Sequence, residues 1–67
     1  MKRDTFAIER FTYNDELDLI WDADLDFYFF ENKRDGTISN YFYDKDELIT
    51  KLNDGKLMWT AGFNPVM

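Results

Sequence analysis

The carboxylates of residues 15–31 are the side chains in this sequence whose types and spacing could do chemistry. The acids of this segment are Asp15, Glu16, Asp18, Asp22, Asp24, Asp26 and Glu31. No Lys or Arg occurs between Phe11 and Asn32, so the segment contains no countercharge of its own. Clustered carboxylates can catalyse general acid–base reactions, bind a hard cation, or attract a positively charged partner.

The spacing Asp22-x-Asp24-x-Asp26 resembles the start of a calcium-binding loop, in which oxygen ligands alternate along the chain. The match ends there, because the sixth loop position needs glycine and is Phe27, and the twelfth needs glutamate and is Lys33. We therefore predict no dedicated metal site, and at most weak, nonspecific binding of divalent ions.

Acid–base catalysis requires one carboxylate to be desolvated in a pocket, so that its pKa separates from that of its neighbour. A chain of 67 residues has little depth for such a pocket. The sequence contains no His and no Cys, which excludes disulfides and the usual imidazole or thiolate zinc sites, and it has no glycine-rich phosphate loop. We predict that the protein is not an enzyme and uses no cofactor.

The overall charge indicates the class of partner. Fourteen Asp and Glu residues against eight Lys and Arg residues give a net charge of −6, which repels phosphate backbones and anionic lipid surfaces. No segment has the apolar run of a signal peptide or of a membrane span. We expect no direct binding of nucleic acid or of membranes, a cytoplasmic location, and a basic protein as partner.

The acidic segment has the period-2 pattern of half-buried strands. Every odd position from Leu17 to Phe29 is apolar, whereas the acids from Asp18 to Asp26 occupy even positions. One strand over residues 16–32 would be unusually long, so we predict a turn or bulge near residues 22–24 that divides two strands. The alternative is a short helix over residues 14–21, capped by Asn14.

A hairpin is predicted next, because Asp35-Gly36 separates the β-prone residues 27–32 and 37–43. A two-residue loop at Asp35-Gly36 would pair Phe30 with Tyr41, and Tyr28 with Tyr43, on one face. Both faces of this hairpin would then be apolar, and the face outside the core would need to be covered.

The remaining segments complete the sheet and add one helix. We predict a first strand over residues 5–11, a turn over residues 12–15 and a last strand over residues 56–61. Between them, a helix begins after the N-cap residue Asp44 and ends at Gly55. Its buried side chains are expected to be Leu48, Ile49 and Leu52.

The predicted fold class is α+β. One domain over residues 1–67 forms a small antiparallel sheet of about four to five strands, with one helix in the C-terminal half packed on it. The order is β-β-β-β-α-β, or β-α-β-β-α-β if residues 14–21 are helical. Seven Phe, four Tyr and two Trp exceed the needs of one small core, so we also predict a homodimer.

The acidic run has two interpretations. It is either a solvated sheet face that keeps the protein soluble, or a surface that a partner neutralises. The absence of local countercharge favours the second, because neighbouring like charges cost stability. The aromatic residues likewise either complete the core or contact a Lys- or Arg-rich partner. The aromatic candidates for this contact are Tyr28, Phe30, Tyr41 and Tyr43.

In size, acidity and aromatic content, the chain resembles the small nucleic-acid-mimic inhibitors that phages and mobile elements direct against host DNA-binding proteins. The resemblance covers the whole chain in character and includes no shared motif. It implies an acidic protein-binding inhibitor that blocks the basic nucleic-acid site of a host protein. The alternative is a non-catalytic structural or adaptor subunit that docks through its aromatic face.

Overall fold

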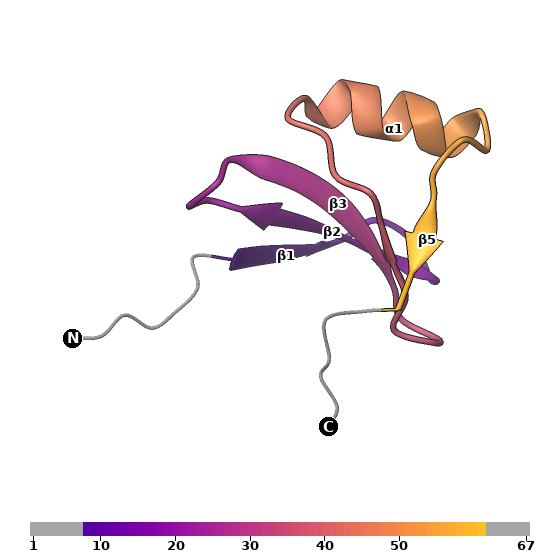
Figure 1. Ribbon diagram of the computed structural model, residues 1–67. Helices are drawn as coiled ribbons and strands as arrows, with labels where there is room; N and C mark the ends of the chain where they lie inside the picture. The colour runs from indigo at the N-terminus through magenta and orange to yellow at the C-terminus, as the bar shows by residue number, and fades with distance from the viewer. Residues whose placement is uncertain (1–7, 62–67) are drawn as a thin grey trace.

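A computed structural model describes residues 8–61 of the chain (Figure 1). Within this range, antiparallel strands form one sheet in the order β1-β2-β3-β4-β5, and a helix lies over one face of the sheet. The elements are β1 (Ile8–Thr12), β2 (Leu17–Asp22), β3 (Phe27–Asn32), β4 (Ile38–Ser39), α1 (Lys45–Asn53) and β5 (Trp59–Thr60). This is the α+β fold, and the order of elements, that the sequence predicts.

Strand β2 confirms the strand predicted for this segment, although Asp18 and Ile20 at its even positions are buried. Ile20 lies opposite Arg10 of β1 on one side and opposite Phe29 of β3 on the other. The helical alternative for residues 14–21 is therefore wrong. Asn14 instead closes the turn between β1 and β2, where its side-chain oxygen accepts the N–H groups of residues 16 and 17, both at 2.8 Å. The predicted first strand overlaps β1, and residues 5–7 lie outside the described range.

The predicted turn within the acidic run is a four-residue loop, residues 23–26. The Oδ1 atom of Asp22 accepts the N–H groups of Asp24 and Leu25 at 2.9 and 3.1 Å. Asp26 has a φ of 61°, and its N–H donates to the carbonyl of Asp22 at 2.6 Å. Asp tolerates this left-handed conformation better than most residues. Two of the acids therefore help to form the turn.

The loop between β3 and β4 has the same geometry. It spans residues 33–36, and Asn32 accepts the N–H of Arg34 at 2.8 Å. Gly36 has a φ of 78°, and its N–H donates to the carbonyl of Asn32 at 2.8 Å. The predicted two-residue loop is wrong, because Asn32 and Thr37 pair across four loop residues.

The longer loop changes the pairing of β3 with the next strand. Glu31 lies opposite Ile38, so Phe30 lies opposite Ser39. The N–H of Phe30 donates to the Ser39 hydroxyl at 2.9 Å. The predicted pairing of Phe30 with Tyr41 is therefore wrong.

One extra residue then enters the chain after β4. Tyr28 of β3 pairs with Phe42. Between this pair and the pair of Glu31 with Ile38, the chain after β4 has one residue more than β3. Such a bulge moves the following side chains to the other face. The ring of Tyr41 accordingly stacks on Phe27, with centroids 4.2 Å apart. The predicted pairing of Tyr28 with Tyr43 is also wrong, because the longer loop shifts the pairing by two residues and the bulge reverses only one of them.

Helix α1 has the predicted ends. The Asp44 side chain accepts the N–H of Asp46 at 2.9 Å, which caps the first turn. Gly55 follows the helix with a φ of 70°, a conformation that glycine adopts without steric cost. No helix in the described part of the chain is long and apolar enough to cross a membrane.

The main core lies between α1 and the sheet. Leu17, Phe30 and Leu48 are its buried residues. Half-buried side chains that pack around it are Leu19, Tyr28, Phe42, Ile49, Leu52 and Leu57. Ile20 and Phe29 are buried on the opposite face of the sheet, so both faces carry buried apolar groups.

We predict that Leu48→Ala lowers the free energy of unfolding by about 2–5 kcal/mol, because it leaves a cavity where Leu48 is 0% exposed. Leu25→Ala is the matched control: Leu25 is 61% exposed at a loop tip, and its truncation should cost less than about 0.5 kcal/mol. Urea unfolding followed by circular dichroism measures both. Equal urea midpoints for the two variants would contradict the placement of Leu48 in the core.

Candidate functional site

Asp18 is a structural residue and not part of an exposed acidic face. Its side chain is 10% exposed, and it forms ion pairs with Arg10 at 3.1 Å and with Lys33 at 3.6 Å. Arg10 also pairs with Glu31. The acidic segment itself contains no Lys or Arg, as its sequence shows, but Asp18 and Glu31 have countercharges that come from β1 and from the loop after β3. Neighbouring strands bring them beside the acidic segment.

Arg10, Asp18 and Glu31 form a cluster, which we call the Arg10 cluster. It joins the first three strands on the face of the sheet that α1 does not cover. The hydrogen bond to Glu31 raises the pKa of the Arg10 guanidinium, and the bond to Asp18 raises it further against the opposing effect of desolvation. Arg10 therefore stays charged and neutralises both carboxylates.

The end of the sheet that carries the β1–β2 turn has mixed charge. Glu16 and Arg34 form an exposed ion pair at 3.7 Å. The N–H of Lys33 donates to the Glu16 carbonyl at 2.8 Å, which places the β3–β4 loop beside this turn. Asp15 is exposed in the same turn.

The opposite end of the sheet keeps its negative charge. Asp22, Asp24 and Asp26 lie at the β2–β3 loop, and none of them forms an ion pair within residues 8–61. Asp24 and Asp26 are exposed, and Asp22 is half-buried. Asp26 accepts a hydrogen bond from the indole N–H of Trp21 at 3.2 Å.

Exposed apolar side chains accompany these acids. Tyr41 is 52% and Tyr43 is 68% exposed, and their rings meet edge to face at 5.8 Å. Tyr41 stacks on Phe27, which adjoins the loop, and Leu25 projects from the loop itself. We call this surface the acidic–aromatic end; its residues are Asp22, Asp24, Leu25, Asp26, Tyr41 and Tyr43.

The start of α1 adds further acids to the same end. Tyr28, near the start of β3, pairs with Phe42, so the chain leaves the sheet here before it enters the helix (Figure 1). Asp46 and Glu47 lie in the first helical turn and are exposed. Lys45 is the one basic residue of that turn.

The aromatic residues predicted to bind a partner are divided among three locations. Phe30 is fully buried in the core and has no surface for a partner. Tyr28 is half-buried on the helix side of the sheet, whereas Tyr41 and Tyr43 are exposed beyond the bulge. Leu25 was absent from the sequence prediction, because its odd position indicated a strand and not a loop tip.

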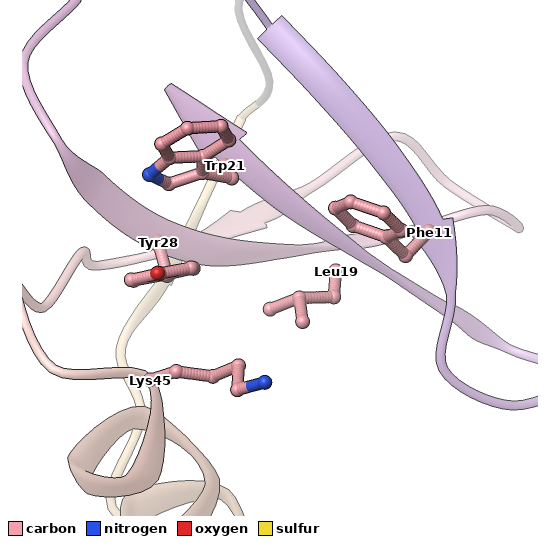
Figure 2. Close-up of a pocket in the computed structure, with 5 residues that line it drawn as sticks. All are labelled: Phe11, Leu19, Trp21, Tyr28 and Lys45. Atoms are coloured by element: carbon pink, nitrogen blue, oxygen red, sulfur yellow. The ribbon is translucent and has the colours of Figure 1, made fainter. Parts of the chain in front are cut away.

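A pocket opens between the sheet and the start of α1. It has a volume of about 380 Å³ and is lined by Phe11, Leu19, Trp21, Tyr28 and Lys45 (Figure 2). The rings of Trp21 and Tyr28 stack with centroids 6.3 Å apart. The alternation within β2 places Leu19 and Trp21 on one face, but only the register of β1 brings Phe11 opposite Leu19, so the sequence did not predict this pocket.

Within residues 8–61, no group of three or more acidic side chains is arranged to hold a metal ion. Comparisons with protein-family models, with curated proteins and with solved structures find no match to this chain. The acidic–aromatic end and the pocket are the two candidate sites of the described residues.

We predict that Arg10→Gln lowers the free energy of unfolding by about 1–3 kcal/mol, because it removes a charged hydrogen-bond partner from the buried carboxylate of Asp18. The control is Arg34→Gln, whose partner Glu16 is exposed and whose loss should cost less than about 0.5 kcal/mol. Unfolding is measured in urea, because urea is uncharged and leaves the ionic strength the same for both variants. A loss of equal size in the two variants would show that the Arg10 cluster is not structural.

Proposed function

We propose that this protein is a small, non-catalytic inhibitor that mimics nucleic acid and occupies the basic site of a host DNA-binding protein in the cytoplasm. The proposed contact surface is the acidic–aromatic end. The observation that supports it is that Asp22, Asp24 and Asp26, which form no ion pair within residues 8–61, lie beside the exposed rings of Tyr41 and Tyr43.

The distribution of charge supports a binding role for this end. The protein neutralises Asp18 and Glu31 with Arg10, and Glu16 with Arg34. It provides no such partner at the β2–β3 loop within the described residues. Lys and Arg side chains of another protein would supply the countercharge, and the local negative field would speed their approach.

The loop also brings two acidic residues together along the backbone. In an extended strand, residues four apart are separated by about 13 Å. Here the N–H of Asp26 lies 2.6 Å from the carbonyl oxygen of Asp22, so the two residues are close neighbours. The loop therefore holds its acids within a shorter length than a strand of alternating acids would, which is nearer to the charge spacing along a nucleic-acid backbone.

The tyrosines add a contact that suits a basic partner. Arg and Lys interact favourably with aromatic faces, and aromatic and Arg residues are common at the centres of protein interfaces. Tyr41 and Tyr43 are held by the stack on Phe27. Their exposed rings therefore need little reordering when a partner binds.

A second candidate function is that of an adaptor subunit, favoured by the exposed Leu25, Tyr41 and Tyr43. In that case apolar contacts would provide most of the affinity. The two functions differ in salt dependence, because charge-steered binding weakens steeply with ionic strength and apolar docking does not.

The test removes the negative charges of the β2–β3 loop and keeps the hydrogen bonds that form its turn. We predict that the triple variant Asp22→Asn, Asp24→Asn, Asp26→Asn folds normally, because Asn also accepts the loop hydrogen bonds and tolerates the left-handed φ of residue 26. Its affinity for a basic DNA-binding partner should fall by about 0.5–3 kcal/mol, with a flatter salt dependence. Partners are captured from a bacterial lysate and titrated calorimetrically at two salt concentrations.

The matched control is Asp15→Asn, Asp35→Asn, Asp54→Asn, which removes the same charge from exposed positions elsewhere. It should bind like the wild type. DNA added as competitor should displace the protein. Unchanged affinity in the first variant, or simultaneous binding of DNA and this protein, would overturn the mimic and leave the adaptor.

We also propose a homodimer formed by β1. All five residues of this edge strand are exposed, and no strand covers its outer edge within the described residues. Unpaired edges of this kind pair readily with another strand. Sedimentation equilibrium should give twice the chain mass of 8.1 kDa, and amide exchange over Ile8–Thr12 should slow as concentration rises. A monomer throughout the micromolar range would contradict the dimer.

A further inference from the structure

We infer that the pocket between β1, β2, β3 and the start of α1 binds a small carboxylic acid with an apolar body, such as a medium-chain or aryl-alkanoic acid. This site is distinct in chemistry from the acidic–aromatic end. It is apolar with one cation, whereas that end is anionic.

The size and walls of the pocket fit a small molecule. Its volume of about 380 Å³ lies within the usual range of ligand sites, about 300–1,000 Å³. The walls are the side chains of Phe11, Leu19, Trp21 and Tyr28, which offer no charged group (Figure 2). Such walls favour an aliphatic or aromatic body.

The pocket is largely preformed. Asp26 fixes the indole ring of Trp21 by a hydrogen bond of 3.2 Å, and Tyr28 stacks against the same ring with an interplanar angle of 24°. Leu19 and Tyr28 also pack on the core. A ligand therefore meets fixed walls and loses less free energy in ordering them.

Lys45 determines the charge of the ligand. Its side chain extends along the pocket opposite Leu19 in Figure 2, and it forms no ion pair within residues 8–61. Its ammonium group repels a cationic ligand that the aromatic rings would otherwise attract. A single ammonium matches one carboxylate. The Asp26 carboxylate, which accepts the indole N–H of Trp21 at the pocket wall, disfavours a group of higher charge such as a phosphate.

Tryptophan fluorescence tests this inference directly. Trp59 lies on β5, outside the pocket lining, so Trp59→Phe leaves Trp21 as the reporter. In this background, octanoate below its micelle concentration should give a saturable change in emission. Octanol, which has the same chain without the charge, should bind more weakly.

The decisive variant is Lys45→Gln, with Lys51→Gln of the same helix as control. Octanoate affinity should fall about tenfold in the first and stay unchanged in the second, whereas octanol affinity should be equal in all three proteins. Circular dichroism confirms that each variant is folded. Equal binding of octanoate and octanol, equal losses in the two variants, or no response of Trp21 to octanoate would each overturn the site.

Discussion

Phe30 is the residue on which most of the arrangement depends. Its side chain is fully buried against Leu17 and Leu48, which holds α1 on the sheet. Its N–H donates to the Ser39 hydroxyl, which fixes β4 in a register two residues away from the one that a short Asp-Gly loop would produce. The position of Lys45 over the pocket and the exposure of Tyr41 both follow from these two contacts.

The acids of the sequence have two different roles, and the sheet separates them. Asp18 and Glu31 face Arg10 across adjacent strands, where their burial makes a countercharge necessary. Asp24 and Asp26 are exposed at a loop, where contact with solvent makes a countercharge unnecessary. Within the described residues, the acids of the β2–β3 loop therefore have no ion pair, and this end of the sheet is the surface that we propose for a partner.

Local patterns in the sequence predicted the helix and most strands. They did not predict the strand pairing, the ion pairs or the pocket, because these depend on contacts between distant segments. The alternation from Leu17 to Phe29 and the cap at Asp44 act within one segment, so they could be read directly. The four-residue loops depend on Asn32 pairing across the loop, and the bulge before Phe42 depends on packing in three dimensions. The Arg10 ion pairs and the pocket join separate strands, and no single segment of sequence indicates them.

The two proposed sites meet at Asp26, which links their energetics. Its carboxylate belongs to the acidic–aromatic end, and it also fixes the Trp21 ring of the pocket. A carboxylic acid bound at Lys45 would add negative charge near this end and strengthen its attraction for a basic partner. By thermodynamic linkage, the partner would strengthen ligand binding by the same factor. Because an Asn side chain at position 26 can still accept the indole N–H, loss of charge at the end leaves the pocket wall in place, and the two sites can be separated experimentally.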